Sequence, residues 1–188
     1  MHPADGEVLV ESVRVLRAIK LAKREEFVSS DRFDSRANDR RPHRDDFRPT
    51  TEDRKQRPVR VSVWNHQFTK AAQAQRFMPQ AIVSIWSLLV SQVLGAASQN
   101  ELAGRVRVVG DPENAPSRNE GWVGHSGIEG LETEGNDREA IANVRTLRAD
   151  LAFLARPTCP TCDTVPTADK LECGCMGSSA PPAPATSL

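Results

Sequence analysis

The sequence predicts a small α/β or α+β domain of two or three layers, with about three strands and three to four helices, flanked by an N-terminal helix and disordered segments. Two stretches, residues 59–63 and 106–109, alternate apolar and polar residues as half-buried strands do. A third, residues 136–154, carries an apolar stripe at helical spacing. The 188 residues are 38% apolar and 27% charged, which fits a core domain of about 100 residues and excludes a large catalytic barrel.

The chain divides into predicted regions that differ in composition. Charged residues dominate the stretch before the first strand, cysteines cluster after the last helix, and the end is rich in Pro, Ala and Ser. The regions are an N-terminal helix (1–27), a charged loop or disordered linker (28–46), a small α/β domain (47–156), a Cys-rich zinc module (157–176) and a disordered tail (177–188).

The N-terminal region is predicted to be a helix from the spacing of its apolar residues. Leu9, Val13 and Leu16 fall on one helical face, and Asp5 is a suitable N-cap. Lysines and an arginine near residue 23 would interact favourably with the C-terminal end of the helix dipole.

The predicted domain opens with a strand and a short helix. Residues 59–63 alternate valines with polar residues such as Arg60, which are expected to face away from the core. Thr69 then caps a short helix over residues 70–77, which must end before Pro79.

Residues 77–100 contain no charged side chain. About 20 apolar residues suffice to span a bilayer, but Pro79 and several glutamines interrupt this run, so we expect no membrane span. The run is instead predicted to form a buried strand over residues 81–86 and a helix over residues 87–98. The boundary between the two stays open, because a short apolar run fits either state.

The last strand, a loop and the last helix complete the predicted domain. Residues 104–112 alternate again and end at a Gly-Asp-Pro turn. Residues 119–135 contain five glycines and are predicted to form a loop. Asn136 and Glu139 form a capping-box pattern before a stripe of core-facing residues. That stripe consists of Ile141, Val144, Leu147, Leu151 and Leu154, and Pro157 ends it.

Four cysteines lie close together after the last helix. Cys159 and Cys162 are spaced C-x2-C, and Cys173 and Cys175 follow with C-x-C spacing. Two close pairs separated by a loop can bring four thiolates around one tetrahedral Zn²⁺, so these cysteines are the candidate zinc ligands. Free thiols are the main alternative, and disulfides or an iron–sulfur cluster are further ones.

Two histidines are weaker candidates for chemistry. His125 lies in the glycine-rich stretch and, with Ser126 or Glu129, would be a candidate general base, although a histidine bonded to the backbone is the commoner case. His43, Asp45 and Asp46 together resemble a metal-ligand cluster, but the surrounding arginines disfavour a cation. The common phosphate-loop, nucleophile-elbow and dinucleotide motifs do not occur, so an enzyme is the less favoured interpretation.

Charge and targeting signals narrow the function classes. Residues 1–76 contain 17 Lys and Arg against 12 Asp and Glu. Residues 77–188 have an equal excess of acidic over basic residues. Because acidic residues are interspersed in the basic half, a solvated surface is favoured over nucleic-acid binding. No export signal is visible, so a cytoplasmic location is expected. The favoured function is a bacterial accessory protein that binds a protein partner encoded nearby; a small hydrolase and a nucleic-acid-binding protein are the alternatives.

Several short motifs resemble those of a group of small bacterial proteins. The motifs are DDFRPT (45–50), VSVWNH (61–66), an Ala-rich helix opened by Thr69, and RVVGDPENAPSRNEGWVGHSGIEGL (107–131). The group carries an FRP segment, an LSV-type strand and a DP…P…H loop that ends in I-x-G, and this chain departs from it by inserting SRNEGWVG. The resemblance implies that Phe47 and Pro49 pack against the domain. It implies no activity.

Overall fold

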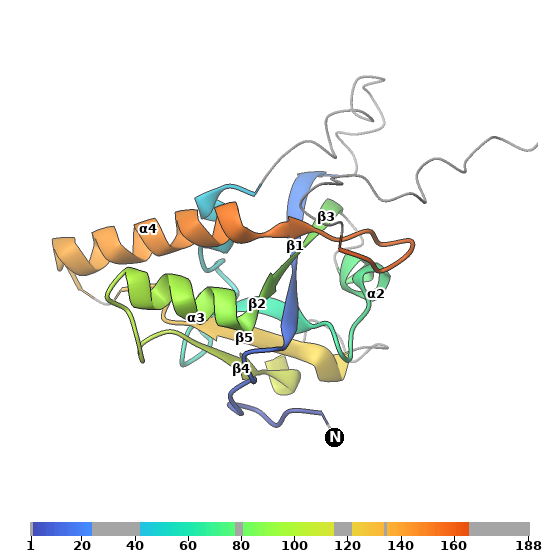
Figure 1. Ribbon diagram of the computed structural model, residues 1–188, viewed down its shortest axis with the longest axis horizontal. Helices are drawn as coiled ribbons and strands as arrows, with labels where there is room; N and C mark the ends of the chain where they lie inside the picture. The colour runs from blue at the N-terminus through green and yellow to red at the C-terminus, as the bar shows by residue number, and fades with distance from the viewer. Residues whose placement is uncertain (1, 24–41, 78–80, 115–121, 134, 166–188) are drawn as a thin grey trace, which may run out of the picture.

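The computed structural model describes residues 2–23, 42–77, 81–114, 122–133 and 135–165. Within these residues the strands form one antiparallel sheet of six strands in the order β4-β5-β2-β1-β3-β6, accompanied by three α-helices (Figure 1). The strands are β1 (Arg14–Lys23), β2 (Arg60–Asn65), β3 (Ala81–Leu89), β4 (Arg107–Gly110), β5 (His125–Glu129) and β6 (Arg156–Pro157). The helices are α2 (Ala71–Arg76), α3 (Val90–Gln99) and α4 (Arg138–Leu154). The expected fold of about three strands and three to four helices was therefore wrong, because the fold contains more sheet than the sequence predicted.

The predicted N-terminal helix is instead the strand β1, which lies between β2 and β3. Its register with β3 runs from Arg14 opposite Leu89 to Lys23 opposite Ala81. Val15 and Leu16 are adjacent, so they point to opposite faces of the sheet, and both are fully buried. A strand that is apolar on both faces loses the alternation typical of strands, and its apolar residues can match helical spacing by chance.

The predicted glycine-rich loop contains β5, whose five residues are all buried between β2 and β4. The glycine at its centre has a packing role, because a Cβ at Gly127 would lie 2.6 Å from the Cβ of Arg60. Glycine is rare in strand interiors and weakens the strand pattern in a sequence. This is why the stretch was predicted to be a loop.

The other predicted elements are confirmed, with small shifts at their ends, but two details were wrong. Ile141, predicted to face the core, is exposed at the start of α4, and the residue at the N-cap of α2 is Lys70, not Thr69. The strand predicted at 59–63 is β2, and the open boundary in the uncharged run falls between Leu89, the last residue of β3, and Val90, the first of α3. Helix α4 is capped by Asp137, not Asn136, and Asp137 Oδ1 accepts from the backbone N–H groups of Glu139 and Ala140 at 3.0 and 3.3 Å.

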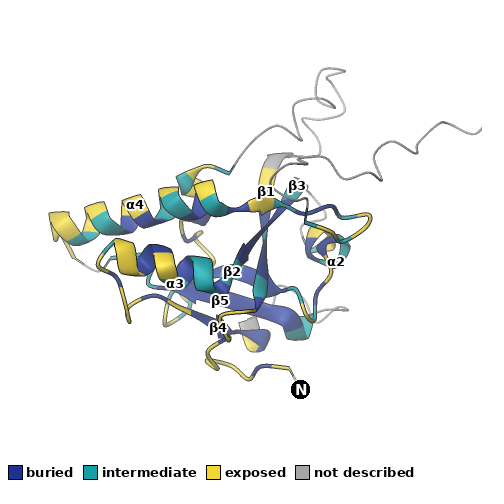
Figure 2. Cartoon of the chain, in the orientation of Figure 1, coloured by how far each residue is buried: buried dark blue, intermediate teal, exposed yellow. Residues whose placement is uncertain are grey.

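Helices cover both faces of the sheet (Figures 1 and 2). Helices α3 and α4 pack on one face over the main core, which includes the predicted core residues Val61, Val108 and Leu151, all fully buried. Helix α2 packs on the other face, in a smaller cluster around Leu16 and Trp64. No helix within the described residues is long and apolar enough to cross a membrane.

Two irregular segments close the ends of this architecture. Residues 6–9 run along the outer edge of β4, where Leu9 N donates to Val108 O at 2.8 Å, and so cover backbone groups that an edge strand would otherwise expose. The short 3₁₀ helix η1 (Arg44–Phe47) packs against α4, and Phe47 is fully buried in the main core. Pro49 is also buried. Most of the predicted linker (28–41) and the predicted tail (177–188) lie outside the described residues.

Candidate functional site

The first two cysteines lie in a closed turn that continues from the edge of the sheet. Thr158 N donates to Ile85 O at 2.8 Å, which extends the pairing of β6 with β3. Cys159 N then donates to Thr164 O at 3.0 Å, and Asp163 N donates back to Cys159 O at 2.9 Å. These bonds close the chain into a loop, with Asp163 in the left-handed region at φ 58°.

The two thiols differ in exposure and in environment. Cys159 is buried and Cys162 is exposed, with its Sγ 2.8 Å from the hydroxyl oxygen of Thr164. The Thr164 hydroxyl is the main cause that lowers the pKa of Cys162 from its ordinary value, and a hydrogen bond with Cys159 contributes less. The thiolate is the form that binds metal, so this environment favours a ligand.

An acidic side chain fixes this turn to the body of the domain. Asp163 Oδ1 accepts from the backbone N–H of Ala71, the first residue of α2, at 2.7 Å. The same oxygen lies 3.0 Å from Nε2 of His66, just after β2. We call residues 158–164 with these anchoring contacts the cysteine turn. Neither Asp163 nor His66 could be identified from the sequence, because their contacts join parts of the chain nearly one hundred residues apart.

The second predicted cysteine pair, Cys173 and Cys175, lies outside the described residues. Within the described residues, no three His, Cys, Asp or Glu side chains gather closely enough to hold a metal ion. The cysteine turn alone therefore offers two of the four ligands that a structural zinc ion needs.

The cluster around His43 has a local structural role. His43 Nδ1 accepts from Asp45 N at 3.3 Å, and Asp46 Oδ2 accepts from His43 N at 2.7 Å. Together these bonds form a reciprocal cap at the start of η1.

His125 is fully buried at the start of β5. Its Nδ1 lies 2.6 Å from the backbone carbonyl oxygen of Asp111, and since a carbonyl only accepts, Nδ1 carries the proton. Burial lowers the pKa of His125 below its ordinary value, although the Asp111 carbonyl opposes this, so the ring is neutral near pH 7. Nε2 is buried and has no hydrogen-bond partner among the described residues.

The predicted partners of His125 are engaged elsewhere. Ser126 Oγ donates to Gly124 O at 3.1 Å, and as the next residue in the strand it points to the opposite face. Glu129 accepts from Arg60 Nε at 3.0 Å and from Arg107 Nε at 2.9 Å. The structure therefore does not bring these side chains together as a base and a nucleophile, and His125 has no contact with solvent.

A buried ion network that was not predicted from the sequence is centred on Arg60 of β2. Arg60 Nη1 donates to Asp111 Oδ1 and to Asp5 Oδ1, both at 2.7 Å, in addition to its bond with Glu129. Burial alone would lower the pKa of Arg60, but the hydrogen bonds with these three carboxylates outweigh burial and raise it. The sequence predicted a solvent-facing Arg60, whereas its side chain is only 7% exposed because the N-terminal segment and the residues after β4 cover it.

No family model, curated protein or solved structure matches this chain. The chemistry of the cysteine turn and the surroundings of His125 are therefore the basis for assigning a function.

Proposed function

We propose that the chain is a small protein-binding accessory protein whose Cys159, Cys162, Cys173 and Cys175 bind one structural zinc ion. The observation that carries the proposal is the cysteine turn, which holds two thiols in a loop closed by its own backbone and tied to α2 through Asp163. A C-x2-C turn of this kind supplies half of a tetrahedral thiolate site before the metal binds.

A site with four thiolate ligands leaves no coordination position for a substrate or an activated water. Its role is to order a short chain segment, and such an ordered segment presents a fixed surface to another macromolecule. The turn lies at the edge of the sheet beside β6, so a zinc ion bound there would not require the core to rearrange. This geometry supports a binding role over a catalytic one.

The hydrolase alternative receives no support from the arrangement around His125. A general base must reach the proton that it removes, at about 2.6 to 3.2 Å or through one water. His125 is fully buried, and its Nδ1 already donates to the backbone.

The proposal is tested by metal-dependent capture of a partner. The natural candidates are the products of neighbouring genes, each mixed with purified wild-type protein, with a Cys159→Ser/Cys162→Ser variant and with a Thr161→Ala variant. Thr161 is an exposed residue of the same turn, so its variant controls for a change in the turn that spares both thiols. We expect one candidate to bind the wild type and the Thr161 variant. Its binding should be lost with the cysteine variant and when zinc is removed from the wild type by a chelator, and should return when Zn²⁺ is added back to the wild type. Equal binding by the cysteine variant would contradict the proposal.

A further inference from the structure

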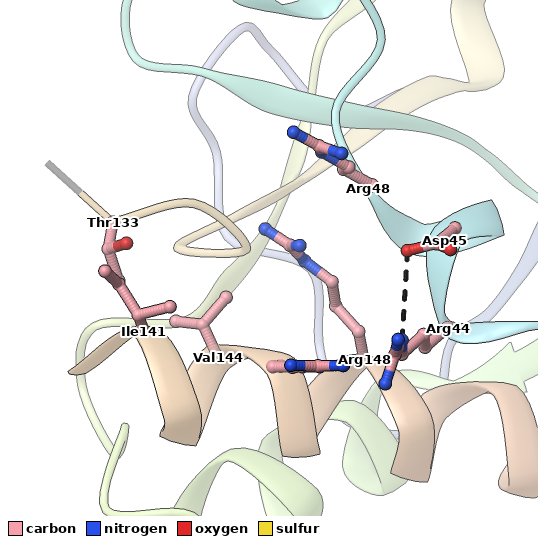
Figure 3. A pocket seen from close by; sticks show the side chains of 8 residues that line it. Arg44, Asp45, Arg48, Thr133, Ile141, Val144 and Arg148 are labelled. Atoms are coloured by element: carbon pink, nitrogen blue, oxygen red, sulfur yellow. Dashed lines mark ion pairs between the residues drawn. The ribbon is translucent and has the colours of Figure 1, made fainter. Parts of the chain in front are cut away.

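An arginine-lined pocket of about 240 Å³ lies between η1 and α4 and shares no lining residue with the cysteine turn or the Arg60 network (Figure 3). Arg48 reaches it from the η1 side, and Arg148 extends from α4 toward the same space. The lining residues, which we call the arginine pocket, are Arg44, Asp45, Arg48, Thr133, Ile141, Val144, Arg145 and Arg148.

Both walls of the arginine pocket are held firmly by the fold. The η1 wall is anchored by the buried Phe47 and by Arg17, whose Nε and Nη2 donate to Asp46 O at 3.1 and 3.0 Å. The α4 wall presents residues at positions i, i+3, i+4 and i+7, which share one helix face. Arg148 is further fixed because its Nε donates to Leu131 O at 2.9 Å. The pocket is therefore pre-formed.

The charges of the lining residues do not balance. Among the described residues, the lining contains four arginines and one carboxylate, Asp45, whose Oδ1 lies 3.9 Å from Arg44 Nε and whose Oδ2 lies 3.2 Å from His43 Nδ1. Another nearby carboxylate, Glu132, is 2.7 Å from Arg54 and so neutralises a different cation. Burial, followed by the like charge of Arg48, lowers the pKa of Arg148. Like charges held together in a partly buried space repel one another, and an anion would relieve that repulsion.

We propose that the arginine pocket binds a small phosphate monoester. Guanidinium groups bind phosphate oxygens through paired N–H donors, and a phosphate monoester carries about two negative charges at pH 7, against one for a monocarboxylate. The side chains of Ile141 and Val144 add an apolar part to the lining, which suits a short organic body attached to the phosphate. The volume is below the roughly 300 to 1,000 Å³ of pockets for drug-sized ligands, which favours a small molecule.

The test is isothermal titration with phenyl phosphate, inorganic phosphate and benzoate at constant ionic strength and pH 7.5. The pocket variant is Arg48→Ala/Arg145→Ala. Both side chains are exposed, and their removal leaves the hydrogen bond from Arg148 to Leu131 O intact. The matched control is Arg76→Ala/Arg105→Ala, which removes the same charge from two exposed arginines outside the pocket. A peptide of five residues with a central phosphoserine is a fourth ligand.

We expect phenyl phosphate to bind the wild type and the control equally, and to bind the pocket variant at least tenfold more weakly. Inorganic phosphate should bind more weakly than phenyl phosphate because it lacks the apolar body, and benzoate more weakly because it carries less charge. Absence of phenyl phosphate binding to the wild type, or an equal loss in the control and the pocket variant, would overturn the proposal. Tighter binding of the phosphopeptide than of phenyl phosphate would overturn the assignment to a small molecule and indicate a modified protein partner.

Discussion

Removal of the central cation of the buried ion network should destabilise the domain severely. In an Arg60→Met variant, Asp111 and Glu129 both lose a buried cation that lies 2.7 and 3.0 Å away. Their side chains are only 1% and 6% exposed, so water cannot replace the lost interaction. Breaking a buried pair by removing one partner costs about 3 to 5 kcal/mol, a large fraction of the roughly 5 to 15 kcal/mol by which a domain is stable.

The assay is urea unfolding followed by tryptophan fluorescence, with Trp64 buried in the sheet as one reporter. Asp111→Asn should cost less, about 1 to 3 kcal/mol, because Arg60 keeps Glu129 and Asp5. The double variant should be more stable than the sum of the two losses by about 1 to 3 kcal/mol, since the two side chains interact directly. Arg105→Met, an exposed control, should stay within about 0.5 kcal/mol of the wild type. A loss below about 1 kcal/mol for Arg60→Met, together with additive losses in the cycle, would refute the reasoning.

Three further predictions concern the same fold. Burial lowers the pKa of His125 in the folded protein, so as the pH falls the unfolded chain gains a proton on this ring before the folded protein does. The stability that neutral His125 contributes is therefore present above the unfolded pKa of about 6.5. It declines as the pH falls below that value, by at most about 1.4 kcal/mol per pH unit. His125→Gln should flatten the pH dependence of the unfolding free energy between pH 7.5 and 5, and an unchanged slope would count against a neutral buried ring. Gly127→Ala should cost about 1 to 3 kcal/mol in urea unfolding, because its Cβ would meet Arg60 at 2.6 Å; a neutral effect would contradict the observed packing. Asp163→Ala should cost about 1 to 2 kcal/mol by removing the acceptor for Ala71 N and the contact with His66, whereas a loss as small as that of an exposed site would show that the cysteine turn is not anchored.

The predictable part of the fold was the part whose residue types follow a regular period. Strand β2 alternates valines with other residues and helix α4 carries an apolar stripe, so Val61 and Leu151 could be placed in the core from the sequence, although β2 is buried on both faces. Strand β1 could not, since Val15 and Leu16 are buried on opposite faces and leave no polar side to mark the period. Strand β5 was missed because its glycine, required by the close approach of Arg60, weakens the strand signal.

The candidate sites show the same division between local and long-range information. The C-x2-C spacing of Cys159 and Cys162 is local and was visible in the sequence. The Asp163 contacts, the Arg60 network and the arginine pocket each join residues from distant parts of the chain, and such contacts follow only from the sheet order and the packing of η1 on α4. Arg60 in particular was assigned to the solvent side of β2, because the sequence does not show that the N-terminal segment covers that side.

The zinc content of the purified chain tests the central claim most directly. Protein without a metal-binding tag, prepared under reducing conditions and without chelator, should contain about one Zn²⁺ per chain by elemental analysis. Cys162→Ser should lose most of that zinc, and Thr161→Ala should keep it, while circular dichroism shows the sheet intact in both, because the turn extends from the sheet edge and contributes little to the main core. Wild-type protein without zinc, or a Cys162→Ser variant that still carries one zinc ion per chain, would contradict the account.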